Sequence, residues 1–326
     1  MSRSFIWAFS VVLAVVIMIN LAVFGYSQAN SIAWSRGPDI PLARGGYFAA
    51  WYEGGLWIAG GSYWKDGKKL WTRETSLYDP HRKTWLSLKP IPRAIGYGVT
   101  AQIGKDIFLL GGTDEDGALN RDIYRLHEGT WSNIGMSPEG FIYAAFVTIG
   151  SRIYIFGGAT SPSDVTKATS DSRVYDVKTK HWSKLAPVPG PPRQTFSAVA
   201  IGTAIYMFGG VTQRPGEKFY NLNDSYRYDT VTGKWSPLKP LPQPMRAFWA
   251  GSDGKNVYLI GGYNEHGLDT VYRYTPSTDT YSIASNLPQP LMDTKFIFNG
   301  GKFYGASGED KLMSRFKGLV IGSLKK

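Results

Sequence analysis

Residues 204–235 read AIYMFGGVTQRPGEKFYNLNDSYRYDTVTGKW and carry the strongest structural signal in the chain. An apolar run ends in the pair Gly209 and Gly210, and two aromatic residues follow at Tyr228 and Trp235. A glycine pair after an apolar run indicates a β-strand that ends in a tight turn or meets another backbone closely. The aromatic residues are typical of strands that pack against a neighbouring sheet.

The same pattern occurs five times. Apolar runs end in a Gly-Gly pair at Gly61, Gly112, Gly158, Gly210 and Gly262. The aromatic pairs that follow are Tyr78/Trp85, Tyr124/Trp131, Tyr175/Trp182, Tyr228/Trp235 and Tyr274/Tyr281, always seven residues apart. The interval from the second glycine to the tyrosine varies between 12 and 18 residues. The fixed interval predicts two paired strands joined by a rigid turn, and the variable interval predicts a loop.

These repeats resemble Kelch repeats, in which about 50 residues form one four-stranded blade of a β-propeller. The resemblance covers residues 30–326 and implies an all-β, six-bladed propeller. It also implies that strands a to d of each blade run outward from the central channel. The glycine pair then ends strand b, the tyrosine lies on strand c and the tryptophan lies on strand d.

The sixth repeat is incomplete. Residues 296–298 and 302–304 predict its strands a and b, with Gly305 and Ala306 in place of the glycine pair, and residues 316–321 predict strand c. Residues 32–34, which include Trp34 and have no glycine pair before them, predict the missing outer strand. Pairing of the two ends in this way closes the ring and removes free sheet edges.

The composition is that of a folded protein, with 43% hydrophobic and 19% charged residues. Cysteine is absent, which excludes disulfides, thiolate metal sites and cysteine nucleophiles. The four histidines show no metal-ligand spacing, so we expect no metal and no cofactor. The net charge of +11 favours attraction to an anionic partner.

The N-terminus predicts export. Residues 5–24 are uncharged and follow Arg3, so they are long enough to cross a bilayer as one hydrophobic helix. They also suit a signal peptide, because Ser27 and Ala29 place small residues before a cleavage point. We therefore expect residues 1–29 to be a signal peptide or membrane anchor and residues 30–326 to be the propeller. The predicted location is periplasmic or extracellular, with membrane contact only through this segment.

Candidate ligand-binding residues lie on the predicted channel face. The connections between blades carry Arg44, Arg93, Arg193 and Arg246, whose guanidinium groups suit a carboxylate or phosphate. The alternative is that these arginines are structural. The other two connections carry Glu139 in one and Asp293 with Lys295 in the other. Long b–c loops add Trp64, Trp71, Arg214 and Glu217, and aromatic residues beside charges suit a sugar.

Among exported Kelch proteins, the chain is most similar to the bacterial sialic acid mutarotase (N-acetylneuraminate epimerase) group. The similarity rests on the blade count, the ring closure and the stretch GGSYWKDGKKLW at residues 60–71. It implies exchange of sialic acid anomers by a glutamate and an arginine of one b–c loop. Glu217 and Arg214 are the matching catalytic candidates, in the reverse order along the chain.

Two functions remain open at this point. One is an exported, mutarotase-like isomerase that binds an acidic sugar or anionic glycan. The other is a non-catalytic propeller that binds a protein or glycan at the cell envelope. Nucleic acid is not an expected partner, because only the charge points to it and export removes the opportunity.

Overall fold

The computed structural model describes residues 31–311 and 313–325. The predicted signal or anchor segment at residues 5–24 and its cleavage point lie outside these residues. Within them, no helix is long and apolar enough to cross a membrane.

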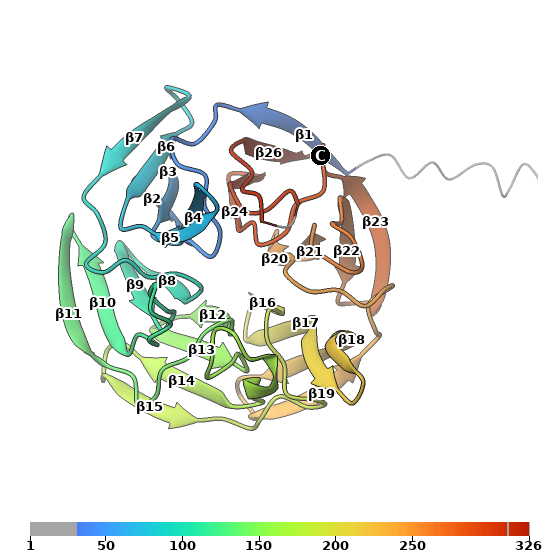
Figure 1. The fold of residues 1–326 in the computed structure, drawn as a ribbon. Coiled ribbons are helices and arrows are strands. Elements are labelled where there is room, and N and C mark those ends of the chain that lie inside the picture. Colours follow the sequence, from blue (N-terminus) through green and yellow to red (C-terminus); the bar gives the residue numbers. More distant parts are fainter. Residues whose placement is uncertain (1–30, 312, 326) are drawn as a thin grey trace, which may run out of the picture.

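Six four-stranded antiparallel sheets surround one central axis as the blades of a propeller (Figure 1). Blades one to three comprise β2 (Phe48–Tyr52), β3 (Gly55–Ala59), β6 (Thr75–Asp79) and β7 (Thr84–Leu88); β8 (Val99–Ile103), β9 (Asp106–Leu110), β10 (Asp122–His127) and β11 (Thr130–Met136); and β12 (Ala145–Ile149), β13 (Arg152–Phe156), β14 (Ser172–Asp176) and β15 (His181–Lys184). Blades four to six comprise β16 (Ser197–Ile201), β17 (Ala204–Arg214), β18 (Glu217–Asp229) and β19 (Lys234–Leu238); β20 (Trp249–Ser252), β21 (Val257–Ile260), β22 (Thr270–Thr275) and β23 (Thr280–Asn286); and β24 (Phe296–Asn299), β25 (Lys302–Ala306), β26 (Leu319–Leu324) and β1 (Ile32–Gly37).

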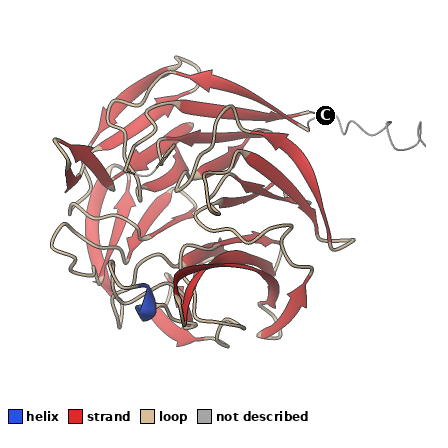
Figure 2. Ribbon diagram, turned by 45° about the vertical axis from the view of Figure 1, so that its right-hand side comes forward, coloured by secondary structure: helices blue, strands red, loops and turns tan. Residues whose placement is uncertain are grey.

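Two further elements lie in the b–c loops. A two-stranded hairpin of β4 (Ser62–Lys65) and β5 (Lys68–Trp71) follows strand b of blade one. In blade three the loop contains η1 (Val165–Lys167), the single short helix in Figure 2. The all-β, six-bladed prediction is therefore confirmed for the part of the chain that the structure describes.

The predicted ring closure is also confirmed. Strand β1 pairs with β26 along its whole length, from Ile32 opposite Leu324 to Gly37 opposite Leu319. The indole of Trp34 donates a hydrogen bond to Ser285 Oγ of blade five at 2.9 Å and packs edge-on against Phe296. Strand β1 thus supplies the outer edge of the last blade.

Two details of the predicted sixth blade are wrong. The two residues that correspond to the glycine pair are Ser307 and Gly308, whose φ angles of 65° and 95° match the 61° and 89° of Gly60 and Gly61. Gly305 and Ala306 instead continue strand β25. Strand c is β26, three residues later than predicted, because the longer b–c loop includes Phe316.

The hydrophobic core is divided among the blade interfaces. Six buried clusters each combine residues of two neighbouring blades, as where Phe48 and Trp57 of blade one meet Leu109 and Leu126 of blade two. The predicted aromatic pairs lie directly opposite each other in four blades, for example Tyr228 and Trp235, with ring centroids 4.8 Å apart.

Blade two differs from this pattern. Its c–d turn contains only Glu128 and Gly129, both with positive φ, as a two-residue hairpin turn requires. The shorter turn shifts the register, so Trp131 lies opposite Leu126 and Tyr124 lies opposite Asn133. Blade two therefore has the same seven-residue interval between its aromatic residues as the other blades, but its shorter turn places different residues opposite each other.

Candidate functional site

A ring of six backbone positions surrounds the channel mouth. One residue from each blade, at the end of each d–a connection, has a positive φ between 50° and 63°. The six residues are Gly46, Tyr97, Tyr143, Thr195, Ala247 and Asp293. The amide of each residue from Tyr97 onward donates a hydrogen bond to the carbonyl of the one before it, at 2.5–3.1 Å. These bonds connect neighbouring blades and turn the six side-chain positions toward the cavity.

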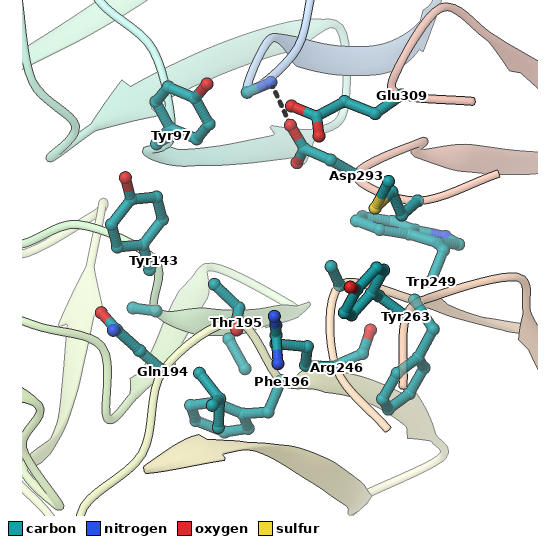
Figure 3. A pocket seen from close by; sticks show the side chains of 18 of the residues that line it. Tyr97, Tyr143, Gln194, Thr195, Phe196, Arg246, Trp249, Tyr263, Asp293 and Glu309 are labelled. Carbon is teal, nitrogen blue, oxygen red and sulfur yellow. Dashed lines mark hydrogen bonds between the residues drawn. The ribbon is translucent and has the colours of Figure 1, made fainter. Parts of the chain in front are cut away.

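The hydrogen bond that closes this ring is accepted by a side chain and not by a backbone carbonyl. The amide of Gly46 donates to the carboxylate Oδ2 of Asp293 at 2.6 Å, where a backbone carbonyl would serve elsewhere (Figure 3). Asp293 is therefore part of the ring and also part of the cavity wall. Burial raises the pKa of this carboxyl group, against the opposing influence of Arg315 and Lys295.

A cavity of about 440 Å³ opens at this end of the channel. Ring residues and the b–c loops line it, and Figure 3 shows Tyr97, Tyr143, Arg246, Tyr263 and Asp293 arranged around the opening. Tyr97 and Tyr143 pack edge to face, with centroids 5.2 Å apart. The size suits a small ligand or a few residues of a partner chain.

Three cations line the cavity. They are Lys69 from the β4–β5 hairpin, Arg246 from the connection into blade five, and Lys295 beside β24. Among the described residues, none of the three forms an ion pair with a carboxylate. Burial lowers the pKa of each of them, and that of Lys295 falls to about 8.

The three cations contact aromatic rings instead. Lys69 Nζ lies 4.8 Å from the ring centroids of both Trp71 and Tyr97. The guanidinium of Arg246 lies 4.6 Å from the ring of Tyr263 and donates to Asn221 Oδ1 at 2.6 Å. These contacts hold the cations in place, but they do not supply a negative charge.

The acidic groups of the cavity are already engaged. Glu309 forms an ion pair with Arg315, which also donates to Ser62 O at 3.2 Å. Burial raises the pKa of Glu309, and the nearby Asp293 adds to this effect. Two further polar atoms in the wall, Gln194 Oε1 and Thr195 Oγ1, are buried and have no hydrogen-bond partner within the described part of the chain.

The structure does not bring the four predicted arginines together. Arg44 and Arg193 are fully buried, with 0% exposure, and do not line the cavity. Both nitrogens of the Arg193 fork bind Asp224 at 2.6 Å, and carbonyls of the surrounding turns accept further bonds. Arg93 pairs with Asp114 at the side of blade two. Of the four, only Arg246 lines the cavity.

The other predicted site residues also lie apart. Arg214 and Glu217 occupy the tip of the β17–β18 hairpin, where they form an ion pair with each other at 2.7 Å and remain about half exposed. Trp64 and Trp71 lie on the β4–β5 hairpin, and the Trp71 indole donates to Thr113 O of blade two at 3.0 Å. None of these four residues lines the cavity.

Several cavity residues escaped sequence reasoning. Tyr97 and Tyr143 occupy equivalent positions of blades two and three, at the end of the d–a connection. Both have a positive φ there. Glu309 occupies the position just after the glycine pair, as Ser62 and Tyr263 do in blades one and five. In blade six the residues equivalent to the glycine pair are Ser307 and Gly308, so an alignment of the repeats on these two residues would have identified Glu309. Nothing in the local sequence of Lys69 indicates that it reaches the channel.

Known proteins match the chain as follows. Residues 98–304 match the family described as the KLHDC2/KLHL20/DRC7 Kelch-repeats domain. Kelch-like protein 25 of Xenopus tropicalis is 24% identical over 285 residues, which cover 86% of this chain and 39% of that protein. Its human namesake is 24% identical over 270 residues, which cover 81% of this chain and 36% of the relative. N-(sulfonatooxy)prop-2-enimidothioate sulfolyase of Thlaspi arvense is 33% identical over 159 residues, which cover 42% of this chain and 44% of the enzyme.

These matches support the Kelch prediction and give no specific support to the sialic acid mutarotase group. The chain spans less than half the length of the Kelch-like relatives, so their functions as whole proteins do not carry over directly. The matched region exceeds half of the 326 residues and covers blades two to five and most of the two inner strands of blade six. The chain therefore belongs to the Kelch-repeat family.

Proposed function

We propose that this chain is a non-catalytic interaction propeller that binds an acidic segment of a partner protein at the mouth of its channel. The observation that carries this proposal is the set of three cavity cations, Lys69, Arg246 and Lys295, without an acidic partner among the described residues. Partly buried cations lose hydration, and a carboxylate in the cavity would compensate for that loss. Burial lowers the pKa of all three side chains, which shows that the protein surroundings disfavour their charged forms.

The remaining lining suits a polypeptide. Phe219, which is 51% exposed on β18, stands at the cavity edge and stacks against the guanidinium of Arg246 at 5.3 Å. The unpartnered Gln194 Oε1 can accept a hydrogen bond from a backbone amide of the incoming segment. An exposed aromatic residue beside a cation is typical of the strongly contributing positions in protein interfaces. If residues 1–29 direct export, the partner is a protein of the cell envelope.

An acidic glycan is the second candidate, because a sugar acid also presents a carboxylate and hydroxyl groups to the same lining. Isomerase activity has less support. Arg214 and Glu217 neutralise each other at an exposed hairpin tip and lie outside the cavity lining. We therefore expect binding at the channel mouth, and we expect no reaction at the β17–β18 hairpin.

Selection from a displayed random-peptide library on the intact protein tests the proposal. We expect selected peptides to be rich in Asp and Glu and their affinity to fall as salt is added. In calorimetry with the best peptide, Arg246→Ala should weaken binding by about 1.5–3 kcal/mol, the range for a charged hydrogen bond. Arg82→Ala is the matched control, since Arg82 is exposed on a c–d turn away from the cavity.

Three results would contradict the proposal: selected peptides without acidic residues, salt-independent affinity, or equal effects of Arg246→Ala and Arg82→Ala. Titration with sialic acid and with neutral N-acetylglucosamine forms a separate arm. Tight, Arg246-dependent binding of the sugar acid, in the absence of peptide selection, would favour the glycan candidate instead.

A further inference from the structure

Lys295 is exceptional among equivalent positions of the six blades. It lies two residues after the ring residue Asp293, at the start of the innermost strand. The corresponding residues of blades one to five are Phe48, Val99, Ala145, Ser197 and Trp249, and none of them carries a charge. The sixth blade alone thus places a primary amine at this depth of the channel.

The amine lies in an aromatic environment. Lys295 Nζ is 5.8 Å from the ring centroid of Phe48 in blade one and 5.6 Å from that of Phe146 in blade three. The side chain therefore extends from the sixth blade toward the far side of the channel. Its amine borders the 440 Å³ cavity and forms no ion pair with a described carboxylate. Burial at this place lowers its pKa to about 8, so about a tenth of the amine is unprotonated at pH 7, far more than for an ordinary lysine.

We propose that Lys295 is a covalent binding site for a small carbonyl compound, and that the cavity fits a 2-oxo acid best. The lone pair of Nζ attacks the carbonyl carbon, and a C=N bond replaces the C=O bond. The nitrogen gives up its two protons, and the carbonyl oxygen leaves with them as water. The product is an imine, and water reverses the reaction, so no oxidant or reductant takes part.

Neighbouring groups suit both halves of such a ligand. Arg246 and Lys69 lack acidic partners within the described residues and can bind its carboxylate, while Lys295 reacts with the adjacent carbonyl. Asp293 and Glu309 line the same cavity, and burial raises the pKa of both. A carboxyl group with a raised pKa can deliver the proton that turns the leaving oxygen into water and accept one from nitrogen.

Reductive trapping tests this inference on the full-length, unmodified chain. The protein is incubated with glyoxylate and sodium cyanoborohydride, and the labelled lysines are identified by peptide mass mapping. We expect Lys295 to be labelled at least about tenfold faster than the exposed Lys255 and Lys302, because one pKa unit corresponds to a tenfold change in the amine's protonation equilibrium. In Lys295→Met, checked for folding by circular dichroism, the fast phase of labelling should disappear and the slow phase should remain.

The pH dependence provides a second measurement. The rate at Lys295 should rise to half its maximum near pH 8, in line with its pKa of about 8. The charge of Asp293 raises the pKa of Lys295 against the effect of burial; the other titratable or charged groups around the cavity are Tyr47, Lys69, Tyr97, Tyr143, Asp164, Arg246, Tyr263, Glu309 and Arg315. Asp293→Asn, which cannot exchange a proton in this way, should slow trapping at Lys295 and leave labelling of Lys255 unchanged.

Labelling of Lys295 no faster than that of Lys255 and Lys302 would overturn the inference. So would the absence of any label at Lys295. Imine formation at Lys295 is a property separate from the binding of an acidic segment, and an experiment can contradict either one without the other. Trapping uses glyoxylate without peptide, whereas the selection and calorimetry use peptide without a carbonyl compound.

Discussion

Arg193 and Arg246 come from the same kind of sequence, a proline-rich connection that enters an innermost strand, but the fold gives them opposite surroundings. Arg193 and Arg44 lie two residues before the ring residue of their blade, and both are fully buried. Arg246 lies one residue before its ring residue and lines the cavity. Successive side chains of extended backbone point to opposite sides, so an offset of one residue separates a structural arginine from a ligand-binding one.

We expect Arg193→Ala to act on stability. Removal of the guanidinium leaves Asp224 and several turn carbonyls without their donor, and loss of one partner of a buried pair costs about 3–5 kcal/mol. Urea unfolding measures the change. Arg246→Ala is the control and should lose ligand affinity with a smaller loss of stability. A stable Arg193→Ala protein with impaired ligand binding would contradict this assignment.

Asp293 should make stability depend on pH. Its pKa is raised by burial, so the folded state holds the proton more strongly than the unfolded chain does. Its contribution to stability is therefore present at pH values below the unfolded pKa and is lost as the pH rises through the folded pKa. Asparagine cannot ionise, but its side-chain oxygen can still accept the hydrogen bond from Gly46.

Asp293→Asn should accordingly gain stability relative to the wild type as the pH rises from the acidic to the neutral range, because the pKa of the Asp293 carboxyl is raised by burial. Thermal melting at several pH values provides the measurement. Glu309 and Lys295 are present in both proteins, and because Asp293 raises the pKa of each of them, the difference also includes their coupled titration. A difference between the two proteins that is constant with pH would show that Asp293 does not titrate in this range.

At the scale of elements, the β17–β18 hairpin extends blade four beyond its sheet and presents an ion pair at its tip. Arg214 also stacks over Tyr220, with 3.4 Å from guanidinium carbon to ring centroid. The tip is exposed, and exposed ion pairs contribute less than about 1 kcal/mol. The hairpin reaches the cavity through Phe219, two residues after Glu217.

We therefore expect Glu217→Gln to leave unfolding free energy and peptide affinity close to those of the wild type. Phe219→Ala should weaken peptide binding by about 1–2 kcal/mol, because an interface aromatic residue loses its contact area. Calorimetry and urea unfolding test both variants. NMR measurement of sialic acid anomer exchange adds a third comparison, and an enhanced wild-type rate that Glu217→Gln abolishes would restore the catalytic role of the hairpin.

At the scale of the whole molecule, the ring depends on the contact between its two ends. Strand β1 covers the outer edge of β26, and Ile32 is buried among residues of blades five and six. Every blade interface contributes one part of the core, so an opened ring weakens two interfaces at once. An uncovered β26 would also present a free edge to other chains.

Deletion of residues 31–37 should lower the melting temperature strongly and promote aggregation, as measured by calorimetry and light scattering. Trp34→Ala should by itself cost about 3 kcal/mol, the lower end of the range for loss of a core tryptophan, since Trp34 is partly exposed. Trp64→Ala is the matched control, because Trp64 lies on the β4–β5 hairpin outside the six sheets. Unchanged stability of the deletion variant would contradict the closure argument.

The architecture could be predicted from local sequence because each repeat has the same requirements. A glycine pair with two positive φ angles recurs in five blades, and in four of them the aromatic residues that follow face each other, a pattern that needs no distant information. The closure by Trp34 could also be predicted, because the sixth repeat lacked its outer strand and residues 32–34 formed a strand that belonged to no other repeat. Ser307 escaped the pattern because a serine occupies a backbone conformation that glycine holds in the other blades.

The site depended on the tertiary structure. The sequence showed arginines in the connections between blades, but their different offsets from the ring decided that Arg44 and Arg193 are buried and that Arg246 lines the cavity. Lys69 comes from a loop of blade one, Arg246 from the connection into blade five, and Asp293, Lys295 and Glu309 from blade six, and no local pattern relates these three parts of the chain. Closing the ring brings them to one cavity. Local spacing specifies each strand and turn, whereas the charge balance of the channel mouth arises only from distant residues that the closed propeller places side by side.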